Sequence, residues 1–265
     1  MALAASSPGI FWANSGVLPA YKSVLPYTQY VKWYETVHIP DWMGAKKGAI
    51  TTAWRYECLD VGRALPFLVT YKYPEISANN APEFRNVTLN SPLLPEGGPV
   101  NKFAQFSVMS GPHIETWRAG SAGDGTASPS RLLLATAETD LDTDRGPLML
   151  SEAIDPPAGM TDAAFHEWYR ETHISEVSQL EGWRRTSRFE NKMGSPRWFA
   201  IHEYEEYGFY DTNKSAPVTA LLGSSDKTKE IQKSARKLDM AFWNLTRAYG
   251  EETVPWGALS EEKIL

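Results

Sequence analysis

The sequence predicts an α+β protein made of two tandem ferredoxin-like repeats, each with the element order βαββαβ. One motif occurs twice: residues 30–39 read YVKWYETVHI, and residues 165–174 read FHEWYRETHI. The leading aromatic residue and the Trp, Tyr, His and Ile that follow it keep the same spacing without a gap. A repeat of this length is the size of a small domain, so we expect the two halves to share one fold. Two later pairs of runs also match, 54–57 with 187–190 and 67–73 with 198–204.

The first half contains the signals of all six elements in order. Pro26 is suited to the first turn of a helix. Tyr30, Tyr34 and His38 are four residues apart, which places them on one stripe of that helix. The helix should end near Pro40, with the His in its last turn. The other expected elements are strands over 10–17, 49–59, 66–73 and 102–110 and a short helix over 82–87.

The second half repeats this order with clearer boundaries. Residues 155–159, which read DPPAG, form a loop before the second motif. Thr161 or Asp162 then makes a suitable N-cap for the helix that carries the motif. The other expected elements are strands over 148–154, 183–190, 197–204 and 238–248 and a helical or irregular stretch over 216–236.

A segment of small residues separates the halves. Residues 120–129 read GSAGDGTASP, a composition typical of a linker or a mobile loop. We therefore expect a first repeat over residues 1–119, a linker over 120–145 and a second repeat over 146–265. Within the linker, residues 131–139 predict an extra strand that could pair with either half.

The composition is that of a globular protein and argues against some partners. With 265 residues, of which 42% are hydrophobic and 22% charged, the chain can bury a substantial core. A formal net charge of -6 and a pI near 5.5 argue against a nucleic-acid partner, because phosphate binding needs clustered Lys and Arg. The short basic group Arg184, Arg185 and Arg188 is expected on the solvated side of a strand.

Cysteine usage and the N-terminal region bear on the compartment. Cys58 is the only cysteine, which excludes an intrachain disulfide, and we expect it to be a small apolar residue on a strand. Residues 1–9 lack the pattern of a secretory signal, and no window approaches a membrane span. These observations predict a cytoplasmic protein without a membrane partner.

The repeated unit resembles the dimeric α+β barrel superfamily, most closely its EthD-like branch. The resemblance rests on a strand, a helix with aromatic-x-x-Trp-Tyr-x-x-x-His-Ile, a Gly-containing loop and an Arg-aromatic-Glu strand, once per half. It implies that two four-stranded antiparallel sheets pack as an intramolecular α+β barrel with the helices outside. Closure would cover the apolar faces and unpaired edges of both sheets. We expect the halves to enclose an apolar chamber that an imidazole reaches.

The same superfamily includes several kinds of enzyme, so the resemblance implies a class of reactions. Its members include cofactor-free polyketide cyclases, decarboxylases and dehydratases, monooxygenases of quinol-like substrates, and haem-binding branches. We expect a cofactor-independent lyase or cyclase that acts on an aromatic or polyketide-derived carbonyl substrate. The alternatives are a haem-binding dehydratase or peroxidase-like enzyme and a non-catalytic carrier of an apolar aromatic ligand. Whether the chain also forms a homodimer stays open.

His38 and His173 occupy the same position of the two repeats and are the first catalytic candidates. A neutral imidazole can accept and donate a proton near pH 7, which suits decarboxylation, dehydration or ring closure. The alternative is a structural His that caps the C-terminus of the helix. Tyr34 and Tyr169 lie one turn earlier on the same stripe and could address the same ligand oxygen. The first half follows its His with the Ile-Pro usual in this branch and the second half with Ile-Ser, a difference that does not decide which half holds the site.

His202 is a further catalytic candidate because the matching strand position of the first half is Tyr71, another group that can carry a proton. Its side chain points either into the barrel or toward the covering helices, opposite to Ile201. Candidates for substrate contacts are Tyr71, Trp33, Trp168 and His113, of which the two Trp are also expected as packing residues.

Other sites are not expected. His166 shares a helix with His173 but lies on another face, where we expect it to be exposed to solvent. The sequence contains no His-x-x-x-His and no Cys pair, so no metal site and no cofactor are expected. It also contains no Gly-x-Ser-x-Gly turn for a nucleophile.

Overall fold

The computed structural model describes residues 7–45, 47–119, 133–135, 145–205 and 225–250. It contains the predicted element order twice. The first set is β1 (Gly9–Val17), α1 (Tyr27–Trp33), the π-helical turn η2 (Tyr34–His38), α2 (Ile39–Gly44), β2 (Thr52–Cys58), β3 (Phe67–Tyr73) and β4 (Ala104–Arg118). The second set is β6 (Leu148–Pro157), α3 (Asp162–Trp168), the π-helical turn η7 (Tyr169–His173), α4 (Ile174–Val177), β7 (Trp183–Glu190), β8 (Trp198–Tyr204), α7 (Asp226–Ser234) and β9 (Ala235–Gly250).

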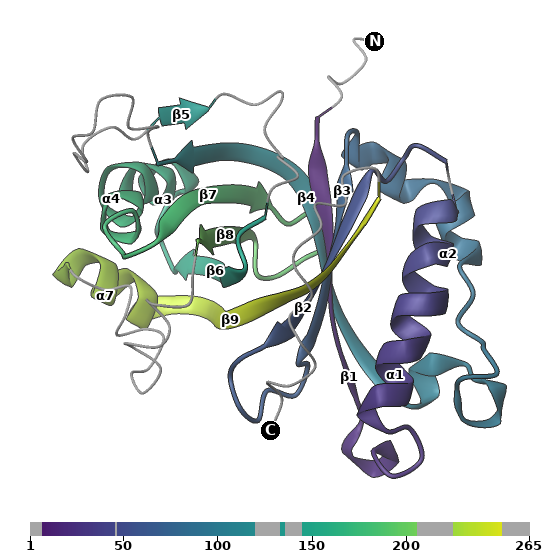
Figure 1. Cartoon of the computed structure of the whole chain (residues 1–265). Helices are drawn as coiled ribbons and strands as arrows, with labels where there is room; N and C mark the ends of the chain where they lie inside the picture. Colours follow the sequence, from purple (N-terminus) through teal and green to yellow (C-terminus); the bar gives the residue numbers. More distant parts are fainter. Residues whose placement is uncertain (1–6, 46, 120–132, 136–144, 206–224, 251–265) are drawn as a thin grey trace.

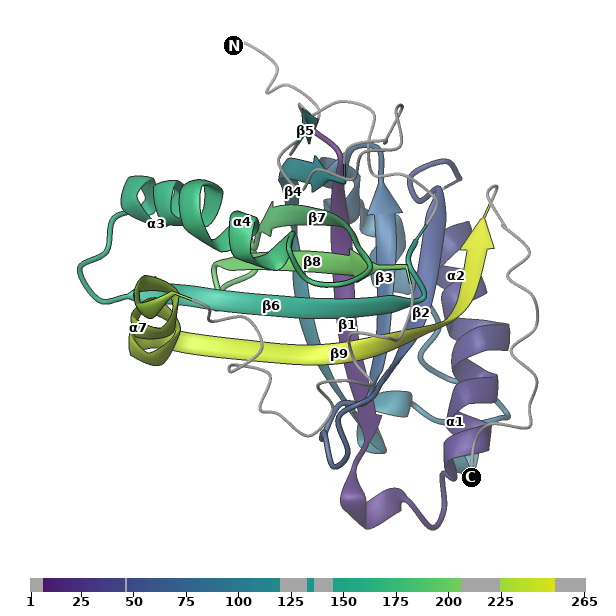
Figure 2. The same ribbon diagram turned by 60° about the vertical axis from the view of Figure 1, so that its left-hand side comes forward.

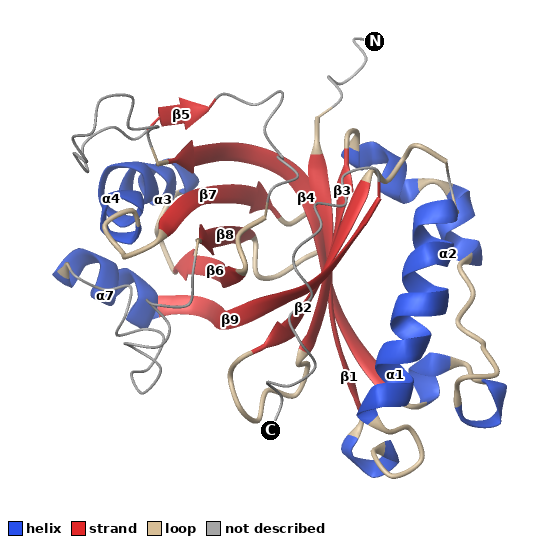
Figure 3. Cartoon of the chain, viewed as in Figure 1, coloured by secondary structure: helices blue, strands red, loops and turns tan. Residues whose placement is uncertain are grey.

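The strands form a closed antiparallel barrel. Their hydrogen-bonded order is β1-β3-β2-β9-β6-β8-β7-β4, and β4 pairs in turn with β1, so the ring closes. The helices of the two halves cover opposite outer sides of this barrel (Figure 1, Figure 3). The predicted fold, tandem ferredoxin-like repeats whose sheets pack as an intramolecular α+β barrel, is therefore confirmed.

The last strand of each half joins the two halves. In the second half, β9 pairs with β6 over residues 235–244 and with β2 over residues 243–250, and Figure 2 shows it passing from one sheet to the other. In the first half, β4 pairs with β1 over residues 104–112 and continues onto β7. The predicted strand over 102–110 was too short, because the extension of β4 onto β7 has no counterpart in a single ferredoxin-like unit.

A glycine allows the close approach at one of these junctions. A Cβ atom on Gly111 of β4 would lie 1.6 Å from the carbonyl oxygen of Glu190, at the end of β7. Any larger residue would push the two strands apart where the halves meet.

Side chains fill the interior of the barrel. Trp12 and Trp243 meet there edge to face, with ring centroids 6.2 Å apart, and Phe199 packs against Trp12. The expected apolar chamber between the two sheets is therefore wrong for the residues that the structure describes. An eight-stranded barrel is only wide enough for the side chains of its own strands.

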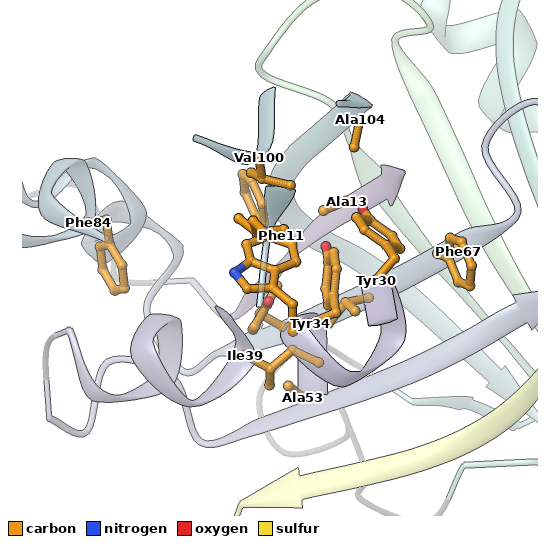
Figure 4. Packing of buried hydrophobic residues seen from close by; sticks show 14 of the residues in the cluster. Phe11, Ala13, Tyr30, Tyr34, Ile39, Ala53, Phe67, Phe84, Val100 and Ala104 are labelled. Atoms are coloured by element: carbon orange, nitrogen blue, oxygen red, sulfur yellow. The ribbon is translucent and has the colours of Figure 1, made fainter. Parts of the chain in front are cut away.

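A separate apolar layer lies under the helices of each half. In the first half, Phe11 of β1 belongs to one buried cluster with Tyr30 and Tyr34 of the helix (Figure 4), and its ring stacks on Trp42 with centroids 5.3 Å apart. In the second half, Phe165 and Trp168 occupy the equivalent layer. The repeated aromatic residues of the motif thus hold the helix of each half onto its sheet.

Ion pairs connect the halves on the helix-covered side, and one of these pairs is buried. Arg188 of β7 lies 2.5 Å from Glu115 of β4, across the junction of the two strands. In the first half, the equivalent Arg55 of β2 lies 2.7 Å from Glu35, which also pairs with Arg247 of β9. Both junctions of the barrel therefore carry an arginine from a matching strand position.

The expectation that the basic group of β7 faces solvent is wrong for two of its members. Arg185 and Arg188 are 4% and 1% exposed. Inside the barrel, Arg185 and Arg145 both bind the carboxylate of Glu203. Burial alone would raise the pKa of Glu203, but the two guanidinium groups lower it to about 2. The pattern misled because β7 is covered on both faces, by the barrel interior and by the helices.

Several smaller predictions can also be compared with the structure. The extra strand is β5 (Leu133–Ala135), which pairs with β4 at Thr116–Arg118. Cys58 ends β2, and burial raises the pKa of its thiol to about 12, as suits an unreactive side chain. Of the stretch 216–236, only the part from residue 225 is described, and most of the linker and the C-terminal tail lie outside the described residues. The short helix over 82–87 is a 3₁₀ turn, Pro82–Asn86.

No helix in the described part of the chain is both long and apolar enough to cross a membrane. Hydrogen bonds of β4 with β7 and of β9 with β2 join the two repeats into one sheet. The barrel therefore does not mark where one repeat ends, and the domain boundaries at residues 119 and 146 stay predictions.

Candidate active site

Each motif His ends a π-helical turn in the middle of its helix. In the second half, η7 ends at His173 and the helix continues to Val177. In the first half, η2 ends at His38 and the helix continues to Gly44, past the predicted end at Pro40. The expected place in the last turn is therefore wrong, and neither His caps a helix C-terminus. π-Helical turns often occur at functional sites.

His173 meets a carboxylate and a second imidazole under the second-half helix. Its Nε2 lies 3.0 Å from Oε2 of Glu152 on β6, and Nε2 of His202 on β8 lies 3.8 Å from the same oxygen. All three residues are at most 1% exposed. Ile201 points into the barrel, which resolves the open orientation: His202 faces the helices. Neighbouring strands and one helix thus bring the three groups together.

Outer contacts fix the orientation of His202. Oγ1 of Thr186 accepts the indole N–H of Trp183 at 3.0 Å and lies 2.9 Å from Nδ1 of His202. Because the indole only donates, the hydroxyl hydrogen is free to bond with Nδ1. When it does so, the proton of His202 lies on Nε2, on the side of Glu152. Gln232 of α7 donates to the other carboxylate oxygen, Oε1, at 3.3 Å.

Glu152 is ionised in this setting. Burial alone would raise its pKa, but the attraction of His173 and then of His202 outweighs burial and lowers the pKa well below its usual range. Burial also lowers the pKa of His202, against the opposing effect of Glu152. An ionised carboxylate favours a proton on Nε2 of His173, and a ring that carries this proton alone offers Nδ1 as a proton acceptor.

Aromatic rings hold the imidazole of His173 in place. Trp168 stacks on it with a centroid distance of 4.8 Å, and Tyr169 meets it edge to face at 4.8 Å. Three buried polar atoms of this group have no hydrogen-bond partner: Nδ1 of His173, Nε2 of His202 and the hydroxyl of Tyr169. Burial and the charge of Glu152 raise the pKa of Tyr169, so its phenol stays a neutral donor. Unpaired buried polar atoms are costly, and their convergence indicates a place for a polar ligand.

The equivalent positions of the first half lack the polar groups. Strand register equates Glu152 with Ala13 and His202 with Tyr71. By the same comparison of β2 with β7, Ala53 replaces Thr186. At these matched positions, only the second half has the carboxylate, the second imidazole and the hydroxyl group that contacts this imidazole.

His38 is surrounded by aromatic rings. Trp33 stacks on it at 4.8 Å, Tyr34 meets it edge to face at 5.1 Å, and Trp42 lies 6.0 Å away between centroids. Tyr71, a predicted substrate contact, packs against Trp42 at 5.8 Å. Burial lowers the pKa of His38 to about 4, against the smaller opposing effect of Asp41. The first half thus keeps the aromatic frame around a neutral imidazole.

The structure separates the remaining histidines from the cluster. His113 lies on β4, where its Nε2 is 2.7 Å from Oγ1 of Thr116 and its ring meets Phe189 of the barrel interior. His113 falls after the strand end predicted at residue 110, and that end is wrong because β4 continues to Arg118. His166 is partly buried rather than exposed, with Nδ1 3.1 Å from Arg188 and its ring against Trp198.

The titration of His38 predicts a pH-dependent stability. Its pKa is about 4 in the folded chain and about 6.5 when unfolded, so the unfolded state takes up a proton first as the pH falls. Stability from this group is present above pH 6.5 and is lost toward pH 4, by about 3 kcal/mol in the free energy of unfolding. Urea denaturation at pH 7 and pH 4 should show that His38→Phe, which keeps a stacking ring, loses less stability than the unchanged chain. Equal losses would contradict this role of His38.

Sequence reasoning missed Glu152 and Thr186. Their repeat partners are Ala13 and Ala53, so comparison of the two halves drew no attention to them. One signal was available: Glu152 stands in the otherwise apolar and small run LMLSEAI of a predicted strand. A carboxylate in such a run must be paired when it is buried.

Comparison with known proteins identifies the fold. No protein-family model matches this chain. No curated protein sequence matches it either. Solved structures do match: a protein provisionally named a monooxygenase from Fusobacterium nucleatum subsp. nucleatum has a TM-score of 0.53 at 8% identity, covering 94% of this chain and 97% of its own.

Two further solved structures are similar over most of their length. An anthrone oxidase-like protein has a TM-score of 0.53 at 9% identity, covering 92% of this chain and 93% of that protein. A mutant chlorite dismutase from Candidatus Nitrospira defluvii, solved with cyanide, has a TM-score of 0.51 at 10% identity and covers 92% of each chain. At such low identity the likeness concerns the fold alone, and it agrees with the barrel described above.

Proposed function

We propose that this protein is an enzyme whose active site is the cluster of Glu152, His173 and His202 in the second half. The observation that carries the proposal is an ionised, fully buried carboxylate 3.0 Å from one imidazole and 3.8 Å from another. Burying a charge costs free energy unless the charge is paired. Buried charges with shifted pKa values are therefore concentrated at functional sites. The first half, with Ala13 and Tyr71 at two of these positions, then acts as scaffold.

The reaction that this site supports best is cofactor-independent acid/base chemistry beside a carbonyl group. Nδ1 of His173 removes a proton from the carbon next to the carbonyl, while the electron pair moves to the carbonyl oxygen. The Nε2 proton of His202 and the hydroxyl of Tyr169 are placed to stabilise the resulting oxyanion. Glu152 orients His173 and stabilises the imidazolium that forms.

This chemistry serves lyases and cyclases that act on aromatic or polyketide-derived carbonyl compounds. An enolate formed in this way attacks a second carbonyl in ring closure, or it expels a β-hydroxyl group as water with the proton that His173 has taken up. In decarboxylation, Nδ1 of His173 instead takes the carboxyl proton of a β-keto acid and returns it to the carbon after carbon dioxide has left. The aromatic layer around the site, including Trp168 and Tyr169, suits a flat substrate. The anthrone oxidase-like neighbour, named after an aromatic ketone, is compatible with such a substrate.

The EthD-like branch and an origin by fusion of two gene copies belong to the same proposal. Support comes from the motif repeated once per half and from the matching element order of the two sets. We retain residues 1–119, 120–145 and 146–265 as the first repeat, linker and second repeat.

A haem enzyme is the second candidate that the superfamily resemblance implies, and the described residues do not fit it. Nε2 of His173 is held by Glu152, and rings lie against His173 at 4.8 Å on two sides. A porphyrin bound to His38 would have to displace Trp33, Tyr34 or Trp42. A Soret band in the purified protein would overturn this judgement.

A non-catalytic carrier is the third candidate. This candidate gives no reason to bury an ionised carboxylate between two imidazoles. A carrier would bind its aromatic ligand equally well after substitution of His173 and would show no turnover.

A matched pair of substitutions tests the proposed function. Aromatic β-keto acids and anthrone-type ketones should be screened for loss of carbon dioxide or for new aromatic absorbance. On a substrate found in this way, His173→Gln should lower kcat by about 10²–10⁴-fold, the usual contribution of a general acid or base. His38→Gln changes the equivalent residue of the first half and should keep most of the activity. Full activity in His173→Gln would refute the proposal.

A further inference from the structure

We infer that Glu152, His173 and His202 also form a binding site for one divalent transition-metal ion, for which Zn²⁺ is the best fit. One oxygen and two imidazole nitrogens from these residues lie within 4.8 Å of one another. Imidazole and carboxylate are ligands that Zn²⁺ prefers in proteins, and three protein ligands leave a fourth position open. This reverses the sequence-based expectation of no metal site, because two histidines distant in sequence converge in the fold.

The distances suit an ion once the two imidazoles close around it. Zn²⁺ lies about 2.0–2.2 Å from such ligand atoms, which places the ligand atoms roughly 3–3.5 Å from one another. Glu152 Oε2 lies 3.0 Å from His173 Nε2 and 3.8 Å from His202 Nε2, and the three ligand atoms lie within 4.8 Å of one another, so the imidazoles must move toward each other to bind the ion. The unpaired Nε2 of His202, in a residue 0% exposed, independently indicates a missing partner at this point.

Outer contacts are in place for two of the three ligands. When Nε2 of His202 binds a metal, its proton moves to Nδ1, which then donates to Oγ1 of Thr186 at 2.9 Å. Thr186 can accept this bond together with that of Trp183, because a hydroxyl oxygen has two lone pairs. Gln232 holds the second oxygen of Glu152. Such partners fix the ring and carboxylate orientations that a metal needs.

The first half supplies an internal control. It has an imidazole at the same motif position, His38, but the matching strand positions hold Ala13 and Tyr71. Without the carboxylate and the second imidazole, this half should not bind the ion.

A metal at this cluster would inhibit the proposed reaction, a consequence that rests on the proposed function. Metal ligands must be deprotonated, so the ion takes the place of the protons on Nε2 of His173 and His202. His202 then has no proton to offer an oxyanion, and His173 is no longer a free base. Zn²⁺ and the substrate reaction should therefore exclude one another.

The binding test uses the full chain without a histidine tag, freed of metal by a chelator. Zn²⁺ and Co²⁺ are added separately and incubated until binding is complete, because the site is buried. The expected result is about one tightly bound equivalent of Zn²⁺ per chain and, for Co²⁺, visible absorption bands of a low-symmetry nitrogen and oxygen site. Both should be lost in Glu152→Gln and in His202→Gln, with folding of each variant checked by circular dichroism.

His38→Gln and His166→Gln are the matched controls, and both should bind metal as the unchanged chain does. Absence of stoichiometric binding in the unchanged chain would overturn the inference, as would undiminished binding in folded cluster variants. The activity measurement is separate: Zn²⁺ that binds at the cluster without slowing turnover would refute the proposed acid/base roles and leave the metal site standing.

Discussion

Replacing Glu152 by Gln should lower kcat about a hundredfold or more, with a smaller change in KM. The neutral amide keeps the size of the side chain but removes the charge that stabilises a protonated His173 during the reaction. It can also donate to Nε2, which would favour a proton on Nδ1 and block the acceptor. Steady-state kinetics on an identified substrate measure this effect.

The control for this prediction is Glu190→Gln. Glu190 ends β7 and pairs with Lys192 at the surface, outside the cluster, so its amide variant should keep normal turnover. Thermal unfolding of Glu190→Gln should match that of the unchanged chain, and circular dichroism should establish that Glu152→Gln is folded at the assay temperature. Normal kcat in a folded Glu152→Gln protein would exclude a catalytic role for this carboxylate.

Replacing Glu115 by Ala should lower the free energy of unfolding by about 3–5 kcal/mol, the usual effect of removing one partner of a buried ion pair. The carboxylate of Glu115 lies 2.5 Å from Arg188 and 2.8 Å from Arg170. The side chain of Glu115 is 6% exposed and that of Arg188 is 1% exposed. The variant leaves Arg188 buried without its carboxylate, 3.8 Å from the ring of Tyr169. Urea denaturation measures the loss.

Two variants sharpen this second prediction. Lys192→Ala removes a surface pair and should cost less than 1 kcal/mol, as exposed pairs do. Adding Arg188→Met to Glu115→Leu removes both buried charges and should recover much of the stability. A loss below 1 kcal/mol in Glu115→Ala would contradict a structural role for this pair between the halves.

The repeat made the fold predictable because the same order of helices and strands could be inferred from two copies of one sequence pattern. Matching aromatic and apolar positions gave both helices and most strands, and an apolar face on each sheet requires cover. Strand extensions were not predictable in the same way. The extension of β4 past Gly111 depends on contacts with β7, a strand more than sixty residues away in sequence.

The site was only partly predictable, for a related reason. His173 and His202 were among the candidates because their positions are matched in the two halves. Glu152 was not, because its counterpart is Ala13 and repetition cannot reveal a residue present in one copy. The spacing of His173 and His202 along the chain also hid their convergence, which arises from β8 lying beside β6 beneath the helix.

Asymmetry between two similar halves is the physical basis of the proposed function. Each half surrounds a motif imidazole with Trp and Tyr, yet only the second half combines it with a buried carboxylate and another imidazole at the matched positions. His38 then stays neutral and structural, while His173 is oriented for proton transfer.

The most direct test of this claim is a crystal structure of the protein with an aromatic carbonyl compound bound. We predict that the carbonyl oxygen lies within hydrogen-bond distance of His202 or Tyr169 and that the adjacent carbon faces Nδ1 of His173. A compound bound instead beside His38, with the second-half cluster closed and unchanged, would contradict the account.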